Sequence, residues 1–180
     1  MSKVLLPLAD GFEEIEAISV ADILRRGGLD VIIAAILTKE VVGAHGVKVI
    51  ADTLFDDIKD FDFDAIVLHG GNLGYKNLAK SDKLLELLRK FDEKNKLIGA
   101  ICAAPYVLAK AGIIKNSYTC YPSIELEIKK SGYIDNKSVV IDGNIFTSRG
   151  PATAIEFALE LLKKLKGDEI ARNVREGVLA

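Results

Sequence analysis

Short apolar runs alternate with segments of helical periodicity along nearly the whole chain, and this alternation constrains the fold more than any other feature. An apolar run of roughly four to eight residues is typical of a buried strand, whereas three- to four-residue spacing is typical of an amphipathic helix. Strands are predicted at residues 4–9, 29–36, 65–69, 97–101 and 117–121, with hairpins at 41–51 and 139–148. Helices are predicted at 13–26, after Ser81, at 103–111, at 122–131, after Pro151 and at 168–175. The helical spacing places Ile15, Ile18 and Ile155 among the inward-facing residues.

Strands that alternate with helices predict an α/β fold with a mostly parallel sheet and helices on both faces. In such sheets, ligands bind at the carboxyl ends of the strands, near the point where the strand order reverses. The residues that follow each predicted strand are therefore candidates for a site. They are residues 10–16, 69–73, 102–104, 121–122 and 149–150.

Composition excludes several classes of protein. The chain has 180 residues, 49% of them hydrophobic, which predicts one domain over residues 1–180 with a sizeable core. Its formal net charge is −2 and its charges are interspersed, so we expect no nucleic-acid partner. No apolar run reaches the roughly 18–20 residues of a membrane span, and the start of the chain lacks a secretory signal. We therefore expect a cytoplasmic protein with no membrane partner, in which Cys102 and Cys120 are free thiols.

Cys102 is the strongest candidate for a reactive group. It lies where a predicted strand runs directly into a helix, between the small residues Ala100 and Ala103, with Pro105 suited to the first helical turn. This layout is typical of a nucleophile elbow, in which a tight turn presents the side chain at the edge of the sheet. The helix N-terminus is expected to lower the pKa of the Cys102 thiol. The alternative is a small buried hydrophobic residue at a junction, since free cysteines often have that role.

Backbone donors and a carboxyl group are expected near this thiol. The glycine pair Gly70-Gly71 follows another strand, and the N–H groups of Gly71 and Ala103 are suited to an oxyanion hole, although a glycine pair also makes ordinary turns. The acidic group at residues 13–16 opens the first helix. A poorly solvated carboxyl beside the thiol would have a raised pKa and would act as a hydrogen-bond donor. Periodicity does not decide which glutamate this is.

The two histidines, His45 and His69, are candidates for activating the thiol, because a Cys–His pair is the usual arrangement. His69 directly precedes the glycine pair, although its position favours a strand-end histidine with a local hydrogen bond. Cys120 is interpreted as a buried strand residue. No metal-ligand cluster or phosphate-binding glycine loop is recognised, so we expect no metal and no cofactor.

Several separated motifs together resemble the ThiJ/PfpI superfamily, most closely its small DJ-type branch. The motifs are DGFEEIE at 10–16, AHGV at 44–47, GGNLG at 70–74, AICAAP at 100–105 and TSRGP at 147–151. The resemblance implies a flavodoxin-like three-layer sandwich and a homodimer. It implies that Glu16 is the buried, protonated partner of Cys102, and that Gly71 and Ala103 supply the backbone donors. It also implies that His45 approaches the cleft from a partner subunit.

One departure from the family pattern affects the chemistry. Where many members carry a histidine near the cysteine, this chain has Tyr121, and a phenol with a pKa near 10 is a poor base at neutral pH. This argues against a cysteine peptidase. His69 stands where the family usually has proline, and we hypothesise that it partly replaces the missing base. Arg149 is a further possible cleft residue, although a surface ion pair explains it equally well.

The resemblance implies two readings of the same cysteine. In the first, Cys102 is the nucleophile of an enzyme acting on reactive carbonyls, either as a glutathione-independent glyoxalase or as a deglycase of methylglyoxal adducts on thiols and amines. In the second, Cys102 is a peroxide sensor whose oxidation alters chaperone or partner binding under oxidative stress. An inert structural domain is a third reading. The sequence does not separate them.

Overall fold

A central sheet of seven strands organises the molecule, which is described here by a computed structural model covering residues 2–180. The strand order is β5-β2-β1-β6-β7-β9-β8, and every pair is parallel except β8 with β9. The strands are β1 (Lys3–Leu8), β2 (Asp30–Ala35), β5 (Thr53–Leu54), β6 (Ala65–Leu68), β7 (Leu97–Ile101), β8 (Val139–Asp142) and β9 (Ile145–Ser148). A separate antiparallel hairpin consists of β3 (Glu40–Val42) and β4 (Lys48–Ile50).

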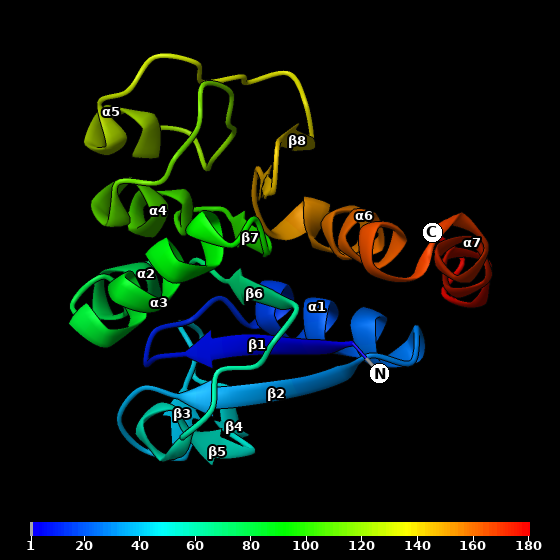
Figure 1. Cartoon of the computed structure of the whole chain (residues 1–180), viewed down its shortest axis with the longest axis horizontal. Helices are drawn as coiled ribbons and strands as arrows, with labels where there is room; N and C mark the ends of the chain where they lie inside the picture. Colours follow the sequence, from blue (N-terminus) through cyan, green and yellow to red (C-terminus); the bar gives the residue numbers. More distant parts are fainter. Residues whose placement is uncertain (1) are drawn as a thin grey trace.

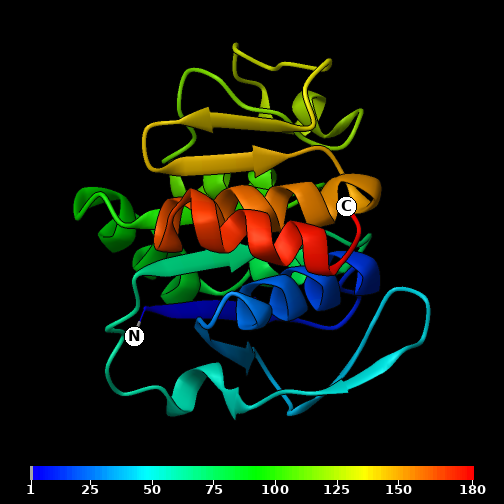
Figure 2. The same ribbon diagram turned by 90° about the vertical axis from the view of Figure 1, so that its right-hand side faces the viewer.

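Helices cover both faces of this sheet (Figure 1). One face carries α1 (Glu14–Arg26), α6 (Ala154–Lys166) and α7 (Asp168–Gly177), which lie toward the viewer in Figure 2. The other face carries α2 (Gly74–Leu78), α3 (Asp82–Glu93) and α4 (Pro105–Ala111), with α5 (Ile124–Ile128) packed beyond α4. Short 3₁₀ turns occupy Phe55–Asp57 and Pro151–Thr153. The predicted flavodoxin-like three-layer sandwich is confirmed.

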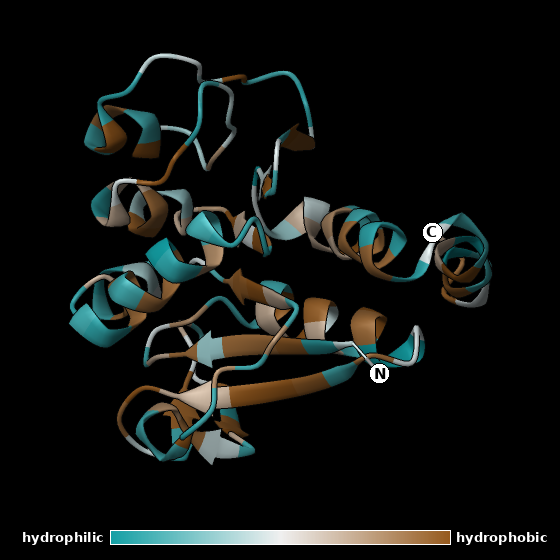
Figure 3. Cartoon of the chain, viewed as in Figure 1, coloured by the Kyte–Doolittle hydropathy of each residue, from teal (hydrophilic) through white to brown (hydrophobic). Residues whose placement is uncertain are grey.

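Apolar strands between two helical layers form the core, and Figure 3 shows the hydrophobic β1 and β2 against helices with hydrophilic outer sides. Gly99 shows how closely the layers pack, because a Cβ there would lie 3.0 Å from the ring of Phe157 on α6. Ser81 caps α3 as predicted, with its hydroxyl oxygen accepting from the N–H of Leu84. Gly112 ends α4 with a left-handed φ of 79°.

The prediction of a strand at residues 117–121 is wrong. Among residues 2–180, the strand-like pairing of this segment is limited to an isolated bridge between Tyr118 and Tyr133, and three of its N–H groups bond to partners outside a ladder. The N–H of Thr119 donates to the hydroxyl of Thr147, and the N–H of Tyr121 donates to the carbonyl of Cys102. Tertiary contacts therefore replace the predicted strand pairing.

The helix predicted at 122–131 is shorter than expected, because Ser123 and Lys129 adopt left-handed backbones at the two ends of α5. The inward placement of Ile15, Ile18 and Ile155 is also wrong, since these side chains are exposed. The buried side of α1 instead includes Glu16, Ala17, Val20, Ala21, Ile23 and Leu24. Within residues 2–180, no helix is long and apolar enough to cross a bilayer.

Candidate active site

Cys102 forms the turn between β7 and α4, and its backbone has the left-handed φ of 63° that non-glycine residues rarely adopt. Two hydrogen bonds hold the residue there. Its N–H donates to the carbonyl of Ser148 at 2.9 Å, and its carbonyl accepts from the N–H of Tyr121 at 2.8 Å. The residue is 8% exposed. This is the sharp strand-to-helix turn expected of a nucleophile elbow.

Glu16 is the glutamate that the fold directs toward this turn. It lies in the first turn of α1 and is fully buried. Its Oε2 accepts from the N–H of Gly70 at 2.8 Å, whereas Oε1 is buried and no donor in residues 2–180 is aligned with it. Burial raises the pKa of Glu16 from 4.5 to about 7, although the N–H of Gly70 and the neighbouring thiol of Cys102 oppose that rise. The carboxyl therefore exchanges a proton near neutral pH.

The thiol of Cys102 and the carboxyl of Glu16 share one buried environment. The prediction of a lowered thiol pKa is wrong. Burial raises the pKa of the Cys102 thiol, and the Glu16 carboxylate raises it further. The N–H groups of Ala103 and Gly71 act in the opposite direction. Two such groups titrate as a pair, so the sulfur ionises most easily when its proton passes to Glu16.

Two glycines make room for this arrangement. A Cβ on Gly70 would lie 2.9 Å from the sulfur of Cys102, and a Cβ on Gly71 would lie 2.1 Å from the carbonyl oxygen of Gly11. Gly71 also has a left-handed φ of 96°. The sequence did not predict that Gly70 leaves space for the sulfur or that Ser148 anchors the elbow. The glycine pair was the only sequence signal for the role of Gly70.

His69 lacks the properties of a base that would activate Cys102. Its ring is buried, and neither ring nitrogen has a hydrogen-bond partner among the described residues. Burial lowers the pKa of His69 to about 3, so the ring is neutral and a weak base at neutral pH. It also has no part in the pKa shifts of Cys102 or Glu16. These observations disfavour the hypothesis that His69 replaces the family histidine.

The remaining predicted residues lie at the edges of the site. His45, in the β3–β4 turn, is exposed and its Nδ1 lies 2.9 Å from Oε2 of Glu14 on the same chain. Tyr121 is half exposed and its ring packs over Gly150. Arg149 is half-buried and donates its backbone N–H to the carbonyl of Ser138. Tyr121 therefore reaches the elbow through its backbone rather than through its phenol.

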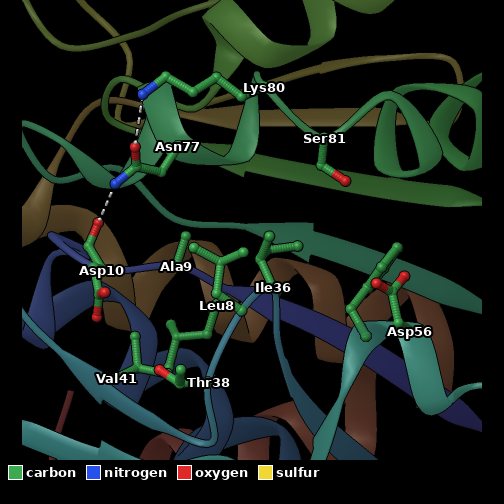
Figure 4. Close-up of a pocket in the computed structure, with 12 residues that line it drawn as sticks. Leu8, Ala9, Asp10, Ile36, Thr38, Val41, Asp56, Asn77, Lys80 and Ser81 are labelled. Atoms are coloured by element: carbon green, nitrogen blue, oxygen red, sulfur yellow. Dashed lines mark hydrogen bonds between the residues drawn. The ribbon is translucent and has the colours of Figure 1, made fainter.

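Cys120 is buried as predicted, although it lies outside any strand. Burial raises the pKa of its thiol to about 12, so little thiolate forms at neutral pH. A separate cavity of about 410 Å³ opens at the carboxyl ends of β1 and β2 (Figure 4). Asn77 stabilises its wall, because its side chain donates to the carbonyl of Asp10 and accepts from Lys80. Neither Cys102 nor Glu16 lines it.

Comparison with known proteins identifies the family. The sequence profile of the DJ-1/PfpI family matches residues 2–164. The chain is 43% identical to dj-1beta of Drosophila melanogaster over 183 residues, covering 99% of this chain and 98% of that protein. The chain belongs to the DJ-1/PfpI family. The crystal structure of Drosophila DJ-1beta superposes with a TM-score of 0.96 at 42% identity, covering 100% of this chain and 99% of that one. The predicted family resemblance is confirmed.

Other family members differ in length and in name. A Caenorhabditis elegans relative named glutathione-independent glyoxalase DJR-1.2 is 40% identical, covering 92% of this chain and 89% of that protein. DJ-1 homologs A and B of Arabidopsis thaliana are each 41% identical, but the chain spans only 46% and 39% of their lengths. The DJ-1/PfpI family thus includes a named glyoxalase together with considerably longer proteins.

Proposed function

We propose that this protein is a thiol-dependent glyoxalase and deglycase that acts on methylglyoxal and on its adducts with thiols and amines. The observation that carries the proposal is the pairing of Cys102, on its left-handed turn, with the buried carboxyl of Glu16. A nucleophile and an acid–base group with a pKa near neutrality are then adjacent. The name of the C. elegans relative supports the same chemistry.

The first step is attack of the sulfur on the aldehyde carbon. Glu16, as a carboxylate, takes the proton of the Cys102 thiol while the new C–S bond forms. The developing oxyanion lies against the N–H groups of Gly71 and Ala103, which already interact with the sulfur at rest. Glu16 then gives this proton to the oxyanion, which yields a hemithioacetal and restores the carboxylate. With a hemithioacetal or hemiaminal adduct as substrate, the sulfur instead displaces the thiol or amine from the former aldehyde carbon: the C–S bond to Cys102 forms, the bond to the leaving group breaks, and the leaving group takes the thiol proton from Glu16.

The second step moves a proton between adjacent carbons. Glu16 removes the proton from the carbon bonded to sulfur and, through an enediol, returns it to the neighbouring carbon, which leaves a thioester of a 2-hydroxy acid. Water then cleaves the C–S bond to release lactate and the thiol. One carbon is oxidised as its neighbour is reduced, so methylglyoxal and one water give lactic acid without an external oxidant or reductant.

The exposed apolar side chains of α1 and the hairpin support the predicted homodimer. Ile15 is 57% exposed and Ile18 is 44% exposed. Val47, in the turn before β4, and Ile50, on β4, are also exposed. Large apolar side chains grouped at one surface are typical of an interface. We propose that two copies associate through α1. Light scattering on wild-type protein and on Ile15→Glu would test this association. A monomeric wild type would refute it.

The decisive experiment measures lactate formed from methylglyoxal by wild type, Cys102→Ser, Glu16→Ala and Cys120→Ala. We expect lactate from wild type and from Cys120→Ala, which removes the thiol outside the site. We expect none above background from the other two variants, with circular dichroism showing that both are folded. Failure of wild type to form lactate, or activity in Cys102→Ser, would refute the proposal.

A second candidate function is peroxide sensing by the same thiol. It is favoured by the difference between the two thiols, since Cys102 retains 8% exposure whereas Cys120 is fully buried. Two molecules of hydrogen peroxide would convert the thiol to a sulfinate and release two of water, and the Gly71 and Ala103 N–H groups would hold its oxygens. Mass spectrometry after treatment with low peroxide tests this reading. Inactivity toward methylglyoxal together with selective oxidation of Cys102 would favour the sensor.

A further inference from the structure

We propose that the cavity of about 410 Å³ at the carboxyl ends of β1 and β2 is a second binding site, whose ligand is a small carboxylate with an apolar body. The cavity is separate from the candidate active site, because neither Cys102 nor Glu16 lines it. Its volume lies within the range of small-molecule pockets, about 300–1,000 Å³. The carboxyl edge of a mostly parallel sheet is also where such folds bind their ligands.

One side of the cavity is apolar and rigid. Leu8 at the end of β1, Ile36 after β2 and Val41 on β3 line it, and Figure 4 shows them across the space from Lys80 and Asn77. Leu8 and Val41 are each only 2% exposed, so the packing of the core fixes this wall. An apolar group would therefore meet a surface that is formed before it binds.

The rim adds an apolar side chain that faces water. Leu37, which follows Ile36 in the loop after β2, is 77% exposed and borders the cavity. A ligand that packed its apolar part between Leu37 and the rigid wall would remove apolar surface from water, which favours binding. This accounts for the apolar body of the proposed ligand.

The opposite side is polar and carries a cation without a charged partner. Nζ of Lys80 donates to the amide oxygen of Asn77 at 3.2 Å, and within residues 2–180 it pairs with no carboxylate. The hydroxyl oxygen of Ser81 accepts from the N–H of Leu84, which leaves the hydroxyl hydrogen available to a ligand. Ser81 also caps α3, and the N-terminus of a helix favours negative charge. Together these groups select an anion.

The two carboxylates at the rim have partners of their own. Oδ1 of Asp56 pairs with Nζ of Lys83 at 2.9 Å, and Oδ1 of Asp10 accepts from the N–H of Val42 at 2.9 Å. The ammonium of Lys80 has only a neutral amide. A ligand carboxylate would replace that amide with a charge-assisted hydrogen bond, which is roughly twice as strong as a neutral one. The cavity therefore favours an acid over an amine.

The surface proposed for the homodimer does not include this cavity. Ile15 and Ile18 are on α1, which covers the other face of the sheet from α2 and α3. On the hairpin, Val41 faces the cavity, whereas Ile50 is paired with the next residue along β3 and points to the opposite side. Association through α1 and the outer side of the hairpin is compatible with an open cavity.

Two-dimensional NMR of the isotope-labelled full chain, titrated with phenylpropanoate, tests the site without any measurement of turnover. The matched probes are the neutral phenylpropanamide and the cationic phenylpropylamine. We expect the acid to shift the amide signals of residues 36–38 and 80–81 saturably at millimolar concentration. The amide should bind roughly three- to fivefold more weakly, the effect of losing one exposed ion pair, and the amine more weakly still.

Two substitutions of exposed residues separate the charge from the apolar contact. Lys80→Met should bind the acid and the amide equally, and Leu37→Ala should weaken the binding of both. The control is Lys59→Met, which removes an exposed lysine outside the cavity and should bind the acid like wild type. Because Lys80 and Leu37 are exposed, both variants should fold like wild type.

The proposal is overturned if the acid shifts no signal saturably, or if its shifts centre on Cys102 or on α1 instead of the cavity. It is also overturned if the amine binds as tightly as the acid, or if Lys80→Met or Leu37→Ala binds the acid as tightly as wild type. None of these results depends on whether the protein turns over methylglyoxal, so this site and the proposed activity fail independently.

Discussion

Gly70 leaves no space for a side chain beside the candidate nucleophile, and Gly70→Ala therefore tests the geometry of the site directly. The added Cβ would lie 2.8 Å from Cβ and 2.9 Å from Sγ of Cys102, and 3.0 Å from the N–H nitrogen of Ala103. The elbow is held by hydrogen bonds to Ser148 and Tyr121, so it cannot retreat without breaking them. Overpacking of this kind costs about 1–3 kcal/mol.

The expected effects on stability and activity follow from that contact. In a domain of this size, 1 kcal/mol shifts Tm by about 2–4 °C, so Gly70→Ala should melt roughly 2–12 °C below wild type. The sulfur must also move away from its N–H donors. Because a displacement of about 1 Å can cost about 10²-fold in rate, a shift of several tenths of an ångström should lower kcat/KM for methylglyoxal by roughly tenfold.

Scanning calorimetry and the lactate assay measure the two effects. The matched control is Gly177→Ala at the end of α7, where an added Cβ meets nothing within 4 Å. That substitution should change stability by less than about 0.5 kcal/mol and leave turnover intact. If Gly70→Ala melts and turns over like the control, Gly70 does not lie against Cys102 and the described site is wrong.

Three further predictions concern titration and burial. Glu16→Gln should lower turnover about 10²- to 10⁴-fold, the usual contribution of a general acid–base group, and a fully active Gln variant would exclude proton transfer by Glu16. Burial raises the pKa of Glu16 from 4.5 to about 7, so the folded chain binds this proton more tightly than the unfolded chain. The resulting stabilisation is complete below about pH 4.5 and is lost as the pH rises to about 7. Urea titrations should show that slope in wild type and a shallower one in Glu16→Gln; equal slopes would contradict the assignment. His69→Leu removes two buried, unpaired nitrogens and should raise stability by about 1 kcal/mol without changing turnover, whereas lost turnover would restore His69 as a candidate base.

Much of the fold could be predicted from the sequence, because its central strands are apolar runs buried on both faces of the sheet. Strands at 65–69, 97–101 and 139–148 could be predicted because a buried strand has one dominant signature, a short apolar run between turn residues. The segment 117–121 has a mixed rather than apolar sequence, and its N–H groups bond to side chains and to the elbow. Apolar content indicates burial, but it does not say which partner satisfies the backbone.

The candidate site was predictable where local sequence determines local geometry. The strand, small residues and proline around Cys102 predict its turn, and the turn is present. The choice of Glu16 among three glutamates depends on how α1 rotates against the sheet, which only packing decides. The exposure of Ile15 and Ile18 has the same origin, since periodicity marks an apolar stripe without saying which neighbour covers it. The raised pKa of Cys102 also escaped prediction, because burial outweighed the short helix that follows.

The left-handed backbone of Cys102 has a consequence for how this protein evolves. A non-glycine residue in that conformation costs about 1–2 kcal/mol, and glycine adopts it freely. Selection for stability alone would therefore favour glycine at position 102 and erase the sulfur. A cysteine there is what the proposed use of the thiol predicts, and Cys102→Gly should melt at a higher temperature than the wild type and form no lactate from methylglyoxal.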